Sequence, residues 1–230
     1  MITRRDLLKA AGAAAAGAAG RADADPREVA PGPNDAAAEP RALSSGTTPL
    51  EQTAPRTTLQ ALTADEADLL TAIVARLIPA DASGPGAVEA GAVAYIDRAL
   101  AGALSSSREA YRRGLAALER YAQSSRGTPF RQLSPTDQDA LLIDVETGAA
   151  TAPGAGLDSS STAFFALVRA HTWQGTFGDP FYGGNRNFVG WDLLGYPGVR
   201  TAVAADDQRL GTVPAPVRRS AYESDMFNKG

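Results

Sequence analysis

Residues 63–79 read TADEADLLTAIVARLIP, and the pattern in this stretch is typical of a helical protein. Thr63 and Glu66 stand three residues apart, as in a capping box, where each side chain binds a free backbone amide at the start of a helix. Pro79 ends the segment, because proline has no amide hydrogen to donate. We therefore predict an amphipathic helix with one buried face. Its apolar residues, at helical spacing, are Leu70, Ile73, Val74 and Leu77.

Four more amphipathic segments follow, most of them with helix start or stop signals. Gly114 lies inside one of them, where glycine costs about 1 kcal/mol relative to alanine, so we expect close packing at this position. No segment shows the alternation of a strand. The sequence predicts an all-α fold, an irregular bundle of about five helices. The second helix is expected at about 87–104, and the third begins after a cap formed by Ser106 and Glu109. The fourth begins at Ser134 and Pro135 and ends at Gly148, and the fifth spans about 161–173.

Residues 174–198 differ from the helical part in composition, because glycines alternate there with aromatic residues. Glycine permits positive φ angles and close backbone approach, and aromatic side chains supply large apolar area. We expect an ordered, irregular segment that packs against a partner chain, since aromatic residues are enriched in protein interfaces. The polar residues 199–230 are predicted to form an extended tail.

Residues 1–24 are typical of an export signal, with a charged start, a short alanine–glycine run and an Ala-x-Ala ending. The adjacent Arg4 and Arg5 indicate the twin-arginine pathway, which carries folded proteins. Residues 25–58 contain six prolines without helical or strand periodicity, so we expect a disordered linker. The helical domain is placed at residues 59–198.

Composition excludes several classes of site. The 230-residue chain has no cysteine and one histidine, which rules out thiolate chemistry and a multi-histidine metal site within one chain. The formal net charge of -4 argues against a nucleic-acid partner. The nearest glycine pattern, at residues 154–156, follows no strand, so a dinucleotide fold is not expected. We predict no cofactor and no metal in this chain.

The single histidine is the one candidate for a catalytic base. A catalytic base needs a nucleophile and an orienting acid within reach, and Asp179 and Asp192 are the acids available nearby. We expect instead that His171 hydrogen-bonds to backbone of the glycine-rich segment. We also expect Asp179 to accept amides of the Gly183–Gly184 stretch and Asn185 to cap a turn.

A long motif stands out in the second half of the chain. It consists of HTWQG at 171–175, GDPFYGGN at 178–185, GW at 190–191 and GYPG at 195–198. Together with LTADE at 62–66 and LIPAD at 77–81, it resembles the small subunit (subunit 3, or gamma) of membrane-associated gluconate 2-dehydrogenases. The resemblance covers about residues 59–198.

This resemblance implies an accessory, non-catalytic role. Such subunits accompany a large FAD-containing dehydrogenase of the glucose–methanol–choline type, and a multihaem cytochrome c subunit often accepts the electrons. The small subunit assists folding and twin-arginine export of the large one, which implies a location in the periplasm or on the periplasmic side of the membrane. No catalytic residue carries over. Structural or contact roles carry over to His171, Trp173, Gly175, Asp179, Pro180, Tyr182, Gly183, Gly184, Asn185 and Trp191.

Two alternatives stay open. In the first alternative, the chain is a self-sufficient exported enzyme that uses His171 and Asp179. In the second, it is a periplasmic binding or scaffold protein unrelated to redox chemistry. Activity of the chain alone that is abolished by His171→Ala favours the first alternative. Ligand binding without activity and without a flavoprotein partner favours the second.

Overall fold

A computed structural model describes residues 58–151, 154, 156–157, 161–200, 202–212 and 214–224. These residues form six α-helices and several single turns of 3-10 helix, with no strand among them, so the all-α prediction is confirmed. The predicted export signal, with Arg4 and Arg5, lies outside the described residues, as does the predicted linker up to residue 57.

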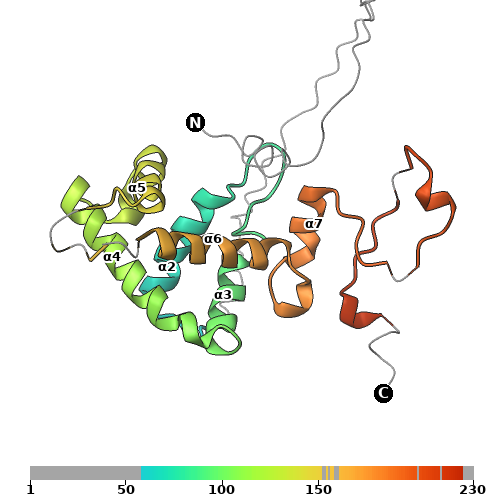
Figure 1. The fold of residues 1–230 in the computed structure, drawn as a ribbon, viewed down its shortest axis with the longest axis horizontal. Helices are drawn as coiled ribbons and strands as arrows, with labels where there is room; N and C mark the ends of the chain where they lie inside the picture. The colour runs from blue at the N-terminus through green and yellow to red at the C-terminus, as the bar shows by residue number, and fades with distance from the viewer. Residues whose placement is uncertain are drawn as a thin grey trace, which may run out of the picture. The chain divides into compact units, whose positions relative to one another are not determined.

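The helices form a bundle in which α6 contacts α2, α3, α4, α5 and α7. Figure 1 shows α6 in the middle of the helices, with α7 near its C-terminal end. Helices α2, α3, α4, α5 and α6 all contribute buried side chains to one apolar core. The bounds are α2 Ala64–Leu77, α3 Ala92–Ala101, α4 Arg108–Arg126, α5 Pro135–Thr147, α6 Ser161–Phe177 and α7 Val189–Leu194.

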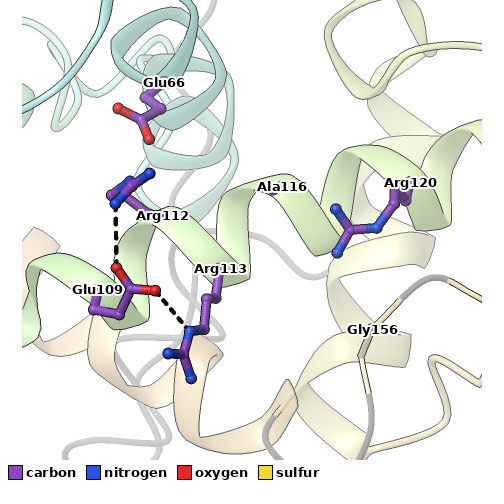
Figure 2. A pocket seen from close by; sticks show the side chains of 7 residues that line it. All are labelled: Glu66, Glu109, Arg112, Arg113, Ala116, Arg120 and Gly156. Carbon is purple, nitrogen blue, oxygen red and sulfur yellow. Dashed lines mark hydrogen bonds and ion pairs between the residues drawn. The ribbon is translucent and has the colours of Figure 1, made fainter.

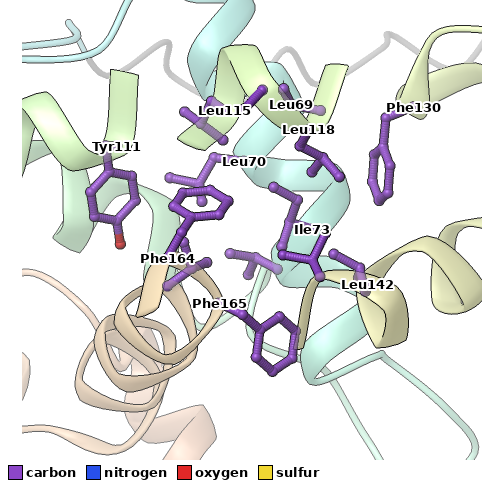
Figure 3. Close-up of a cluster of buried hydrophobic side chains, with 14 of the residues drawn as sticks. Leu69, Leu70, Ile73, Tyr111, Leu115, Leu118, Phe130, Leu142, Phe164 and Phe165 are labelled. Atoms are coloured by element: carbon purple, nitrogen blue, oxygen red, sulfur yellow. The ribbon is translucent and has the colours of Figure 1, made fainter. Parts of the chain in front are cut away.

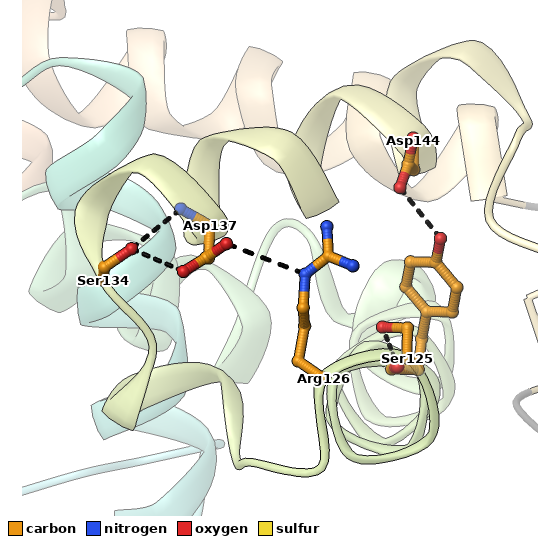
Figure 4. A network of polar contacts seen from close by, with 6 residues as sticks. Ser125, Arg126, Ser134, Asp137 and Asp144 are labelled. Carbon is orange, nitrogen blue, oxygen red and sulfur yellow. Dashed lines mark hydrogen bonds and ion pairs between the residues drawn. The ribbon is translucent and has the colours of Figure 1, made fainter.

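The predicted capping signals of α2 and α5 are present. The Thr63 amide donates to Glu66 (2.8 Å) and the Glu66 amide donates to the Thr63 hydroxyl (3.3 Å). Ser134 accepts from the Asp137 amide at the start of α5, and Gly148 ends that helix with a φ of +77°. Figure 4 shows how Arg126 at the end of α4 reaches Asp137, with 3.7 Å between nitrogen and oxygen. Local sequence therefore sets both ends of α5.

The core contains the predicted apolar faces (Figure 3). Leu70 and Val74 of α2 are fully buried, as are Tyr111 and Leu118 of α4. Gly114 faces α6, and a Cβ at this position would lie 2.1 Å from Phe164 Cδ2. The prediction of close packing at Gly114 is confirmed.

One predicted helix start and one predicted cap are wrong. The second helix begins at Ala92 rather than near residue 87, because residues 86–91 form a turn that packs back onto the end of α2, with the Ala87 amide bonded to the Ile78 carbonyl. The Ser106–Glu109 cap does not form, since Ser107 is the N-cap residue and makes no side-chain cap bond.

Glu109 binds arginines instead of a free amide. Its carboxylate accepts from Arg113 at 2.7 Å and from Arg112 at 3.3 Å. Both arginines lie one turn further along α4, at the spacing that favours ion pairs on a helix. The charged donors on the helix surface therefore replace the predicted cap.

The fifth predicted helix is longer than expected. α6 continues to Phe177 rather than ending near residue 173, and α7 lies where an irregular segment was expected. Thr172 and Thr176 each donate a hydroxyl hydrogen bond to the carbonyl four residues earlier. Packing of α6 on α3 and α7 supports the extension, which composition alone does not reveal.

The segment before α2 is fixed to α3 by one buried carboxylate. Asp97, which is 3% exposed, accepts three successive backbone amides, from Gln60, Ala61 and Leu62, at 2.8–2.9 Å. Buried charge is tolerated when several donors satisfy it. Asp97 thus determines where the chain enters the bundle.

Candidate partner interface

Asn185 organises the irregular segment that follows α6. Its side-chain amide donates to the Gly178 carbonyl (2.9 Å), and its side-chain oxygen accepts from the Gly190 amide (2.8 Å). Its backbone amide donates to the Gly175 carbonyl at 2.7 Å. The residue is fully buried and has a left-handed φ of +43°, which asparagine adopts more readily than most residues. Asn185 therefore joins the end of α6 to the start of α7.

Two glycines of the motif allow close backbone packing around Asn185, between the end of α6 and the start of α7; we call this region the joint. A Cβ at Gly184 would lie 2.1 Å from the Gly175 carbonyl oxygen, and a Cβ at Gly190 would lie 1.8 Å from the Thr176 carbonyl oxygen. Both obstacles are backbone atoms, which cannot move aside as a flexible side chain does. The glycine pattern therefore serves close backbone packing within this chain.

Gly175 and Gly183 also lie where a side chain would meet atoms of α3. A Cβ at Gly175 would lie 2.9 Å from Ala92 Cα, so this glycine lets α6 approach α3. Gly183 ends the turn Pro180–Tyr182 (η3) with a φ of +90°, and the Arg98 side chain covers it. Pro180 occupies the first position of η3, where a missing amide hydrogen costs nothing.

His171 does not bond to backbone of the glycine-rich segment, so that prediction is wrong. Its Nδ1 lies 3.1 Å from the Tyr111 hydroxyl of α4, and the two rings stack with centroids 5.8 Å apart. His171 is buried in the helix bundle, and burial lowers its pKa, because the charged ring loses water. Burial likewise raises the pKa of Tyr111. The pair belongs to the core.

Asp179 has different partners from those predicted. One carboxylate oxygen accepts from the Phe181 amide at 2.9 Å and caps η3. The other accepts from the Ala221 amide at 2.8 Å, in the turn Ala221–Glu223 (η6) of the C-terminal part. The expected bonds to the Gly183–Gly184 amides are therefore not the ones made. Both oxygens are engaged in holding backbone.

The two tryptophans differ in exposure. Trp191 of α7 is 5% exposed, donates its indole hydrogen to the Phe177 carbonyl at 3.0 Å, and packs against Phe188 and Tyr196. Trp173 is 44% exposed, and the Arg169 guanidinium lies over its ring at 5.9 Å. Trp191 stabilises the joint, whereas Trp173 is available to a partner.

The ten predicted contact residues differ in their exposure. His171, Gly175, Gly184, Asn185 and Trp191 are buried, and Trp173 and Tyr182 present large exposed surfaces. The other three, Asp179, Pro180 and Gly183, are half-buried. Other exposed apolar side chains near the motif were not among the predicted contact residues. They are Phe181, Leu194, Tyr196 and, from the C-terminal part, Tyr222. Exposure depends on the tertiary fold, so the sequence alone did not separate the buried residues from the exposed ones.

The C-terminal part of the chain returns to this region. The Val217 amide donates to the Pro197 carbonyl at 2.8 Å, and Arg218 pairs with Asp192 of α7 at 2.8 Å. Together with the Asp179–Ala221 bond, these contacts place residues of the predicted tail against the motif.

A shallow hollow lies on another side, between α2 and α4 (Figure 2). Figure 2 shows Arg112 and Arg113 both reaching Glu109, whose pKa they lower, chiefly through the Arg113 hydrogen bond. None of the ten motif residues lines it. Such exposed pairs are typical of a solvated helix face. The lining residues are Glu66, Glu109, Arg112, Arg113, Ala116, Arg120 and Gly156.

The described residues show neither a metal-binding cluster nor a membrane-spanning helix. No three side chains of the metal-binding types gather there into a group that could hold an ion. None of the helices in this part of the chain is both long and apolar enough to cross a bilayer.

Comparison with known proteins identifies the motif. Residues 64–198 match the sequence profile of the family described as gluconate 2-dehydrogenase subunit 3. The chain belongs to this family. All ten motif residues lie within the matched range, so the buried Asn185 with its partners and the exposed Trp173 and Tyr182 are features of the subunit 3 region. No curated protein and no solved structure matches the chain.

Membership in the subunit 3 family agrees with the resemblance found in the sequence. The family is that of a subunit of a gluconate dehydrogenase complex. The residues from 199 onward lie beyond the matched range, although their described part contacts the motif.

Proposed function

We propose that this chain is the non-catalytic small subunit of an exported, FAD-dependent sugar or gluconate dehydrogenase. In this proposal it binds the large flavoprotein subunit, assists its folding, and carries it through the twin-arginine pathway to the periplasm. A multihaem cytochrome c subunit is the proposed electron acceptor of the complex. The observation that carries the proposal is the family match over the whole motif.

The geometry of the motif supports a contact role over a catalytic one. A general base must reach a proton of the substrate, but His171 is buried against Tyr111. Asp179 uses both carboxylate oxygens on backbone amides. Neither residue is arranged to act on a substrate, so no observation favours a self-sufficient enzyme built on this pair.

FAD is assigned to the partner in this proposal. A dinucleotide fold places the pyrophosphate at a glycine turn between a strand and a helix, and the described residues contain no strand. The chemistry of the complex, oxidation of a CH–OH group, is therefore expected to take place in the large subunit.

Export is the part of the proposal that a pair of variants tests most sharply. Arg4→Lys with Arg5→Lys keeps the charge of the leader but removes the twin-arginine pair. We expect both this chain and the large subunit to stay in the cytoplasm, as measured by fractionation and immunoblotting. The matched control is Arg21→Lys, in the same leader, which should leave export unchanged. Normal export of the large subunit with the double variant would contradict the carrier role.

A further inference from the structure

Three aromatic rings gather on the surface of the motif, and we name them the aromatic cluster: Phe181, Tyr182 and Tyr222. The Phe181 and Tyr222 rings lie with centroids 4.2 Å apart, and Phe181 meets Tyr182 edge to face at 5.4 Å. The two tyrosine hydroxyls share a hydrogen bond. The exposed fractions are 60%, 49% and 37%, respectively, so the rings pack on one another and still present apolar area to solvent.

The aromatic cluster is assembled from two separate parts of the chain. Phe181 and Tyr182 belong to η3, inside the range that matches the family, whereas Tyr222 belongs to η6, beyond its end at residue 198. The carboxylate of Asp179 joins them, since one oxygen caps η3 and the other holds the Ala221 amide.

Local hydrogen bonds also stabilise η6. Ser220 accepts from the Tyr222 amide, and Glu223 accepts from the Ser220 amide, which forms a capping box. Ser220 and Ser224, on either side of this turn, are buried. Tyr222 is therefore held in place by backbone and side-chain contacts, and its ring position does not rely on the aromatic stacking alone.

We propose that the aromatic cluster binds the catalytic subunit of the complex and that the C-terminal part of this chain supplies Tyr222 to that interface. This inference rests on the proposed function, because the subunit role provides the partner. It goes beyond the family match by assigning the region after residue 198 to the same binding surface.

Physical reasons favour these three side chains as the anchor. Aromatic residues dominate the energetic centre of protein interfaces, because they bury much area with few rotatable bonds. Rings that are already ordered lose little further conformational freedom on binding. Asp179, whose carboxylate is engaged in holding backbone, acts as a positioning residue for the cluster.

The test measures the affinity of the purified large subunit for full-length variants of this chain. Phe181→Ser and Tyr222→Ser remove exposed rings, and we expect each to raise Kd by about tenfold to a hundredfold. Leu210→Ser is the matched control, because Leu210 is a fully exposed apolar residue in the same C-terminal part and lies outside the cluster; its Kd should stay within about twofold of wild type. Circular dichroism melting verifies that each variant folds.

Asp179→Asn separates positioning from contact. The asparagine oxygen still caps η3, but the second oxygen that holds Ala221 becomes an amide donor. We expect weaker binding of the large subunit, and no further loss when Tyr222→Ser is added. Additive losses would contradict the positioning role.

The outcomes distinguish the two claims. If wild type binds the large subunit and the two serine variants bind equally well, the cluster proposal is overturned while the subunit role stands. If wild type does not bind, both are overturned. A loss for Phe181→Ser without a loss for Tyr222→Ser overturns the contribution of the C-terminal part.

Discussion

At the scale of single residues, Asn185 shows how the motif stabilises the fold. It makes two side-chain hydrogen bonds from a fully buried position and has positive φ. Alanine leaves the Gly178 carbonyl and the Gly190 amide without these partners and is strained at this φ. We predict that Asn185→Ala lowers the free energy of unfolding by about 2–4 kcal/mol, measured by urea denaturation.

The control for Asn185 is two residues away. Asn187 also has positive φ, at +54°, but it is exposed. Asn187→Ala should therefore cost about 1 kcal/mol, the backbone contribution alone. Equal losses for the two variants would contradict the assigned role of the Asn185 side chain.

His171 gives the protein a predictable pH dependence. Burial lowers its pKa in the folded state relative to the unfolded chain, so the unfolded state binds the proton more readily. The contribution of His171 to the free energy of unfolding is therefore fully present above about pH 6.5, the pKa of histidine in the unfolded chain, and is lost as the pH falls below that value.

The size of this effect is limited by a single proton. Between pH 7.5 and 5.5, the wild-type free energy of unfolding should fall by at most about 1.4 kcal/mol per pH unit from this group. His171→Gln should remove that component in urea denaturation series at the two pH values. An unchanged slope in the variant would show that another group is responsible.

At the scale of helices, Gly114 separates packing from helix propensity. Alanine is preferred over glycine inside a helix by about 1 kcal/mol, but here its Cβ would collide with the Phe164 ring. We predict that Gly114→Ala lowers the free energy of unfolding by about 1–3 kcal/mol, measured by thermal or urea denaturation.

The comparison for Gly114 lies on the exposed side of the same helix. Ala116→Gly changes propensity without touching the core, and it should cost about 1 kcal/mol. A more stable Gly114→Ala protein would show that α4 and α6 move apart without cost.

The helices also show which signals are readable from sequence. The starts of α2 and α5 were predicted because Thr63, Glu66 and Ser134 act on amides three residues away. The end of α6 and the whole of α7 were missed because they depend on contacts between elements, such as the Trp191 bond to Phe177. The Ser106–Glu109 cap was wrong because arginines compete for the carboxylate.

At the scale of the whole molecule, the motif was found from the sequence, but which of its residues are buried and which are exposed was not. The ten residues were assigned from the resemblance of this motif to the subunit 3 family. Which of them are buried follows from the packing of α3, α4 and α6 around them, as His171 shows by pairing with a tyrosine 60 residues away. The contribution of Tyr222 depends on the return of the C-terminal part to Asp179.

The central claim is that this chain serves as a non-catalytic subunit of a flavoprotein dehydrogenase. Its most direct test is native purification of the tagged chain from cells that express both subunits, with mass determination, an absorbance spectrum and a dehydrogenase assay. We predict a stoichiometric complex with a large chain, which shows a flavin spectrum and dehydrogenase activity. When the complex is dissociated, both the flavin spectrum and the activity should stay with the large chain. A flavin spectrum or dehydrogenase activity retained by this chain alone would contradict the account.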